Sequence, residues 1–128
     1  RHSENPLDRV QPVVTKDELL QLIQEARTVE ANDRIFDYVT TLAEATRTHP
    51  MVELGVSPRG ALALCRMAKA HAFLAGRDFV VPEDVAAVFP DVCAHRLILS
   101  AKARMMEEKA ENILAEILKS VDMPVLKA

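Results

Sequence analysis

One segment of the sequence constrains the fold more than any other, because it carries both a helix-start and a helix-stop signal. Ser57 is a good N-cap, Pro58 suits the first helical position, and Gly76 lies where a left-handed C-terminal cap belongs. Small and apolar residues recur between them with helical spacing: Ala61, Leu64, Cys65, Ala68, Ala72 and Ala75. The segment therefore predicts a long helix whose small-residue face allows close packing against other helices.

Further helices are predicted on both sides of this segment. Thr15 and Glu18 form a capping box ahead of an apolar stripe. A second helix starts at Asn32 or Asp33 and ends before Pro50, since the residue before a proline is pushed out of helical geometry. The stripe of the first helix consists of Leu19, Leu22, Ile23 and Ala26, and that of the second of Ile35, Val39, Leu42, Ala43 and Thr46.

The C-terminal part is also predicted to be helical. Pro82 starts a short fourth helix, with acidic residues in its first turn where the helix dipole favours them. Residues 97–99 fit either a strand or a buried connector. The final helix is predicted to run without interruption from Ser100 or Ala101 to about Ser120. Its inward face is expected to consist of Met106, Ala110, Ile113, Leu114, Ile117 and Leu118.

These elements indicate an all-α protein: a small helical bundle of about five helices behind an extended N-terminal lead-in. Residues 1–14 contain two prolines and no helical period, so we assign them to the lead-in and residues 15–128 to the helical domain. At 128 residues with 49% hydrophobic side chains, the chain can bury a core without disulfides. Cys65 and Cys93 are expected to be buried, reduced thiols. Because the first residue is Arg1, we expect the chain to be a fragment of a longer polypeptide.

Charge and hydropathy exclude several classes of function. The formal net charge of −3 argues against general binding to nucleic acids or anionic membranes, which needs a basic excess. No apolar run approaches the roughly 20 residues of a membrane span. The histidines are scattered, no spacing of His and Cys suits a metal, and no catalytic motif is present. We therefore expect neither a metal site nor catalytic residues in this chain.

The segment 55–60, Gly-Val-Ser-Pro-Arg-Gly, is the candidate for anion binding. Gly55 and Gly60 have the glycine spacing of a phosphate-binding loop, but the Lys and Ser or Thr that should follow are absent. A helix N-terminus nevertheless attracts anions, and Arg59 adds a guanidinium that matches phosphate oxygens. Arg66 lies on nearly the same helix face, with Lys69 close by. The residues alone favour a solvated positive face over an anion site.

Three motifs in a fixed order change that balance: G-V-S-P-R-G-A-L-A-L at 55–64, G-R-D-F-V-V-P-E-D-V at 76–85 and H-R-L at 95–97. Together with the segments 6–20 and 121–125, they resemble the C-terminal lid domain of MoxR-type AAA+ ATPases over essentially the whole chain. The resemblance implies a small helical domain beside an α/β ATPase core, with ATP between them. It also implies that Arg59 is the sensor-2 arginine, that Ser57 and Pro58 fix the helix start, and that Arg66 is at most a weak second anion contact.

The sequence departs from the family pattern at three places. Gly60 stands where the family commonly has Ala, which is expected to loosen the first helical turn by about 1 kcal/mol. Val81 replaces the usual capping Thr or Ser before Pro82. The family often has a glycine that breaks the chain before the last helix, but residues 101–112 contain none.

The resemblance also implies partners and cofactors. The lid alone is expected to bind no cofactor and not to hydrolyse ATP, whereas the parent protein would use ATP and Mg²⁺. The lid's partners would be its own AAA+ core, neighbouring subunits of a ring (often a hexamer) and von Willebrand factor A domain proteins, in the cytoplasm of a bacterium or archaeon. Because the docking surface would be exposed in the fragment, weak self-association is also expected.

Two other functions remain open at this point. The chain could be a stand-alone helical protein-interaction module that has kept the lid fold without a nucleotide-related role. It could also be a small helical DNA-binding domain that uses Arg59, Arg66 and Lys69. The acidic pI of about 5.8 and the lack of a recognition helix rich in Asn, Gln and Arg argue against DNA binding.

Overall fold

The computed structural model describes residues 5–126 and shows six α-helices with one very small sheet. The helices are α1 (Lys16–Arg27), α2 (Asp33–Thr48), α3 (Pro58–Leu74), α4 (Pro82–Cys93), α5 (Ala101–Met105) and α6 (Ala110–Ser120). The strands β1 (Val52–Leu54) and β2 (Ile98–Leu99) pair in antiparallel fashion. Two 3₁₀ turns complete the fold, η1 (Pro6–Arg9) and η2 (Ala94–Arg96). The predicted all-α class is confirmed.

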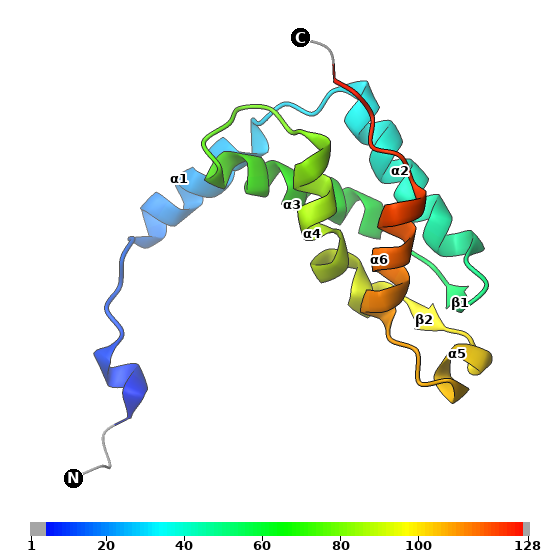
Figure 1. The fold of residues 1–128 in the computed structure, drawn as a ribbon. Coiled ribbons are helices and arrows are strands. Elements are labelled where there is room, and N and C mark those ends of the chain that lie inside the picture. Colours follow the sequence, from blue (N-terminus) through cyan, green and yellow to red (C-terminus); the bar gives the residue numbers. More distant parts are fainter. Residues whose placement is uncertain (1–4, 127–128) are drawn as a thin grey trace.

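Helices α2, α3, α4 and α6 enclose the hydrophobic core (Figure 1). Helices α3 and α4 form a closely packed pair, and α6 lies against both α4 and α2. The largest fully buried side chains are Phe89, Ile35, Leu42, Leu64, Ile113 and Leu114. Both cysteines are buried free thiols, and burial raises the pKa of Cys93 to about 11. No helix of the described residues is long and apolar enough to cross a membrane.

The predicted helix starts are confirmed in detail. The capping box at α1 is complete, with Glu18 N–H donating to Thr15 Oγ1 at 3.1 Å and Thr15 N–H donating to Glu18 Oε1 at 2.8 Å. Asn32 caps α2, which ends at Thr48, two residues before Pro50. The run 97–99 contains the strand β2, one of the two alternatives for that segment.

The N-terminal lead-in differs from the extended segment that we predicted. Pro6–Arg9 forms the 3₁₀ turn η1, which Asn5 caps by accepting the N–H of Leu7 at 3.0 Å. Residues 10–15 then lead into α1 without regular structure. This arm extends away from the body of the domain (Figure 1). The assignment of residues 1–14 to a linker from an ATPase core stays a prediction, and residues 1–4 lie outside the described residues.

The prediction of one uninterrupted C-terminal helix is wrong. The helix stops after Met105, and Glu107 takes a left-handed conformation with φ 56°. Glu107 N–H donates to Arg104 O and Glu108 N–H to Ala103 O, the pattern of a Schellman cap. Helical periodicity cannot reveal such a break when the residue at the left-handed position is not glycine. Because the helix ends there, Met106 does not continue the predicted inward face and is 57% exposed.

Replacing Glu107 by glycine is expected to stabilise the domain. A non-glycine residue in the left-handed region costs about 1–2 kcal/mol, part of which is offset because glycine has more freedom in the unfolded chain. We expect Glu107→Gly to raise the free energy of unfolding by roughly 0.5–1 kcal/mol, measured by urea denaturation. Glu108→Gly is the matched control, because residue 108 has no positive φ; equal or greater stabilisation by that control would contradict the explanation.

Candidate functional site

The candidate site lies at the start of α3, where the fold presents the residues predicted for anion contact. Gly60 N–H donates to Ser57 Oγ at 3.1 Å, and Pro58 occupies the first helical position, so the predicted helix start is confirmed. Arg59 is exposed on the first turn and forms no hydrogen bond or ion pair within the described part of the chain. The helix therefore offers one free guanidinium at the positive end of its dipole.

The loop that leads into α3 is held on both sides by the last turn of α2. Val56 is fully buried, so its backbone N–H and carbonyl both need partners. Thr46 Oγ1 accepts the Val56 N–H at 2.9 Å, and Arg47 Nε donates to the Val56 carbonyl at 2.8 Å. Thr46 Oγ1 also donates to the Ala43 carbonyl at 2.6 Å, which fixes the direction of its own proton. We call the Thr46 and Arg47 bonds to Val56 the Val56 clasp.

Gly55 brings the backbone of this loop close to α2. A Cβ atom at position 55 would lie 2.7 Å from the backbone nitrogen of Arg47 and 2.8 Å from the carbonyl carbon of Thr46. Only glycine allows this approach, so the first glycine of the motif serves helix–loop packing rather than phosphate binding.

Two arginines outside the predicted site residues line a cavity of about 530 Å³ at the start of α3. Arg47 comes from α2 and Arg96 from η2, and both share the cavity with Ser57 and Pro58. Arg96 Nε donates to the Val92 carbonyl at 3.0 Å. The H-R-L motif pointed toward Arg96, whereas no local signal marks Arg47, because its role depends on a contact between α2 and the loop 55–57.

Gly60 also has a packing role that helix propensity alone did not reveal. It is buried, and a Cβ atom there would lie 2.8 Å from Val56 Cγ1 and 3.2 Å from Arg96 Cδ. The glycine thus makes room for the side chains of Val56 and Arg96. Gly60 lowers the helix propensity of the first turn of α3, but a larger residue there would prevent the loop and η2 from packing against that turn.

The structure does not bring Arg66 into the cavity at the start of α3. Arg66 lies farther along α3, where it lines a separate cavity of about 470 Å³ between α1, α2 and α3. Lys69 and Arg27 line the same cavity, whose apolar floor includes Ile23 and Phe36. Arg66, Lys69 and Arg27 make no hydrogen bond or ion pair within residues 5–126, so this face carries free positive charge.

The C-terminal end of α3 is fixed to α4 by a buried carboxylate. Asp84 is fully buried, and both of its oxygens accept from the Arg77 guanidinium, at 2.6 and 2.7 Å. His71 Nδ1 lies 2.7 Å from Asp84 Oδ1, and the Val81 N–H donates to Oδ2 at 2.8 Å. Asp84 thereby supplies the N3 half of a capping box at α4, while Val81 provides no side-chain cap. His71, for which the sequence indicated no partner, belongs to this structural cluster.

Burial of Asp84 raises its pKa, but the bonds from Arg77, Val81 and His71 outweigh burial and lower the pKa from 3.8 to about 2. A lowered folded-state pKa stabilises the fold above the unfolded-state pKa, and this stability is lost as the pH falls through the folded-state value. We expect the domain to lose roughly 2 kcal/mol from this group between about pH 4 and pH 2. Urea titrations across that range should show a flatter pH dependence for Asp84→Asn; an unchanged pH dependence would contradict the assignment.

Comparisons with known proteins identify the family of the domain. Residues 44–117 match the model of the AAA lid domain family. The chain belongs to the AAA lid domain family. It is 37% identical over its full length to the Bacillus subtilis protein YeaC, of which it covers 40%. It is 32% identical over 125 residues to the chaperone MoxR1 of Mycobacterium tuberculosis, of which it covers 33%. The predicted resemblance to MoxR-type lids is thus confirmed.

A solved structure shows the same fold. The crystal structure of a candidate ATPase from Cytophaga hutchinsonii superposes with a TM-score of 0.84 at 32% identity, over 91% of this chain and 38% of that protein. The lid therefore spans well under half the length of the relatives that it matches.

The close packing of Gly55 against the backbone of α2 provides a test of how the loop is held. Gly55→Ala should lower the free energy of unfolding by roughly 1–3 kcal/mol, because its Cβ would meet backbone atoms that cannot move aside. Thermal unfolding followed by circular dichroism measures the effect. Gly76→Ala is the comparison variant: its Cβ would have no neighbour within 4 Å, so only the cost of its φ of 82° remains. A smaller loss at Gly55 than at Gly76 would contradict the packing argument.

Proposed function

We propose that this chain is the lid of a MoxR-type AAA+ ATPase and that Arg59 is its sensor-2 arginine. The observation that carries the proposal is an exposed arginine without a partner, on the first turn of a long helix whose loop is fixed to the rest of the domain. A guanidinium forms charge-assisted hydrogen bonds with phosphate oxygens, and the helix dipole adds positive potential at the same place.

The proposed mechanism follows from the charge on the nucleotide. With ATP bound between core and lid, Arg59 would bond to the terminal phosphates and hold the lid against the core. Hydrolysis and loss of the γ-phosphate would remove those bonds, so the lid could rotate relative to the core and pass the motion to neighbouring subunits. Ser57 and Pro58 would support this role by fixing the helix start. The weaker second anion contact is assigned to Arg66.

The surface of α1 supports docking against an ATPase core. This helix buries none of its residues, and its apolar side chains Leu19, Leu20, Leu22 and Ile23 are 40–50% exposed. Helix α1 packs against α3 but leaves these apolar side chains half-exposed, so a further surface is available to a partner. Leu7, Val10 and Val13 of the preceding arm are exposed as well, which extends the surface toward the side from which the core would enter.

The remaining parts of the proposal concern the parent protein. The phosphate-binding loop, the Mg²⁺ ligands and the water-positioning residue would belong to its core, and the lid would supply no catalytic group. The parent would assemble as a ring, often a hexamer, and would work with von Willebrand factor A domain proteins in the cytoplasm. The relatives named above come from bacteria.

Replacing Arg59 by alanine in the parent ATPase tests the assignment. We expect ATP turnover to fall roughly 10- to 100-fold, because a hydrogen bond to a charged group contributes about 1.5–3 kcal/mol. Arg59→Lys should retain part of the activity, since it keeps the charge but loses the bidentate geometry. Steady-state ATP hydrolysis measures all three proteins.

The isolated chain provides the control for folding. Because the Arg59 side chain is exposed and has no partner, Arg59→Ala should leave the thermal unfolding of this 128-residue chain nearly unchanged. Wild-type ATP turnover in the parent Arg59→Ala protein would overturn the sensor-2 assignment. The stand-alone interaction module would then be the function to pursue.

A further inference from the structure

We propose that Arg47 is a positioning residue for Arg59, so that the last turn of α2 controls where the sensor arginine points. This inference rests on the proposed function, because it assigns a second residue to the same nucleotide response. Arg47 lies in α2, in a different element from Arg59, and the three motifs quoted for the family resemblance do not include it.

The contacts that carry the proposal run through Val56. Arg47 Nε donates to the Val56 carbonyl at 2.8 Å, and its Nη1 lies 3.2 Å from Glu44 Oε2, which restrains the guanidinium from the other side. Val56 immediately precedes Ser57, the cap that sets the first turn of α3. A rotation of the Val56 backbone would therefore shift the cap and move Arg59, whose side chain makes no hydrogen bond or ion pair within residues 5–126.

Thr46 binds the second backbone polar group of Val56, its N–H. Its Oγ1 accepts the Val56 N–H at 2.9 Å, so both polar groups of a fully buried residue are bonded to consecutive side chains of α2. Gly55 lets the loop approach the backbone of those two residues. Three contacts thus fix the backbone on both sides of Val56, and the free guanidinium lies three residues beyond it.

The geometry also explains why the positioning group is an arginine. Arg47 is partly exposed, with 38% of its side-chain surface accessible, yet it reaches a buried carbonyl through Nε while Nη1 stays near Glu44. The planar guanidinium can form both contacts in one orientation, whereas the flexible ammonium of lysine cannot fix the same geometry. We therefore expect Arg47→Lys to restore function only in part.

The first experiment measures amide hydrogen exchange by NMR in the 128-residue chain. Arg47→Met removes the donor but keeps an apolar side chain of similar length. It should speed exchange of the Gly60 and Ala61 amides, which donate to Ser57 Oγ and to the Ser57 carbonyl. Arg104→Met is the matched control, because Arg104 Nη1 also donates to a backbone carbonyl, that of Leu99, at 2.7 Å. Unchanged exchange at 60 and 61 in Arg47→Met, or an equal increase in Arg104→Met, would overturn the proposal.

The second experiment measures ATP turnover in the parent protein, below the unfolding temperature of every variant. Arg47→Met should lower kcat roughly tenfold, as expected when a responding group is misplaced, whereas Arg104→Met should leave kcat near the wild-type value. The decisive comparison is the double variant. If Arg47 acts through Arg59, adding Arg47→Met to Arg59→Ala should cause no further loss.

The outcomes separate this inference from the proposed function. A loss in Arg59→Ala with wild-type turnover in Arg47→Met would refute the positioning role alone. A further tenfold loss from Arg47→Met in the Arg59→Ala background would also refute it, because Arg47 would then act independently. Wild-type turnover in Arg59→Ala would instead refute the sensor assignment, irrespective of the exchange data.

Discussion

The Val56 clasp is the interaction on which the candidate site depends. A buried residue must satisfy its N–H and its carbonyl, and here both partners are side chains of α2 rather than backbone groups of a neighbouring strand or helical turn. This arrangement converts a loop into a fixed connection between α2 and α3. A single backbone orientation at position 56 then determines the cap at Ser57, the direction of the first turn and the position of Arg59.

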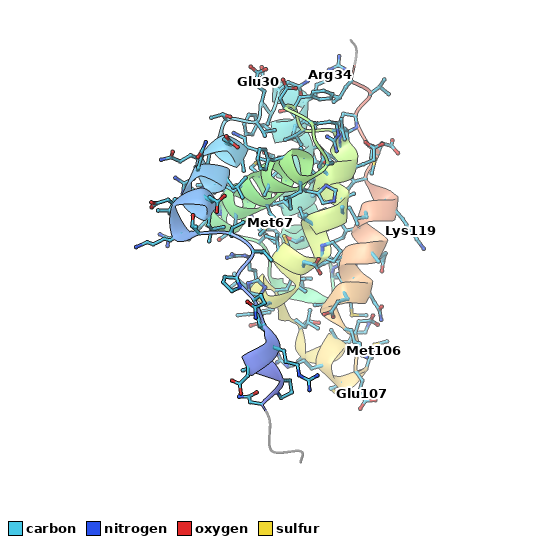
Figure 2. All side chains as sticks on the ribbon, turned by 90° about the vertical axis from the view of Figure 1, so that its left-hand side faces the viewer. Glu30, Arg34, Met67, Met106, Glu107 and Lys119 are labelled. Carbon is cyan, nitrogen blue, oxygen red and sulfur yellow. The ribbon has the colours of Figure 1, made fainter. Side chains whose placement is uncertain are left out.

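The other end of α3 is fixed by different chemistry. Gly76 closes the helix in a left-handed conformation, and Asp84 binds Arg77 and His71 while capping α4 through the Val81 N–H. With both ends held, α3 is a rigid element rather than a hinge. Any motion that starts at Arg59 should therefore move the whole domain, consistent with a lid that moves as one body. In Figure 2, the side chains of Glu30 and Arg34 lie at one end of that body and Met106 and Glu107 at the other.

Features that depend on residues close together in the sequence were easier to predict than contacts between residues from different elements. The caps at Thr15, Asn32 and Ser57 each accept the N–H of the residue three positions on; those at Thr15 and Ser57 were predicted correctly, and Asn32 is one of the two starts predicted for α2. The Schellman cap at Glu107 is equally local, but a glutamate gives no signal for a left-handed residue. The clasp and the Asp84 cluster join residues 7 to 13 positions apart that belong to different elements or to the loops between them, and neither has a periodic signature. Arg47 was missed for this reason.

The exposed face of α1 and the fixed start of α3 would both be needed in a lid that moves in response to a nucleotide. A sensor is useful only if its response moves something, and a moving lid needs both a rigid attachment of the sensor and a surface that can separate from its partner. The hydrophobic core of the lid supplies the rigid attachment, because Val56 is fully buried in the same cluster as Leu42 of α2 and Leu64 of α3. The half-exposed apolar residues of α1 supply a surface that gains stability from contact but is not locked into the fold. Under the proposed function, such a lid would exchange contact with the ATPase core for contact with solvent at modest cost, and a few bonds from Arg59 to a γ-phosphate would suffice to bias its position.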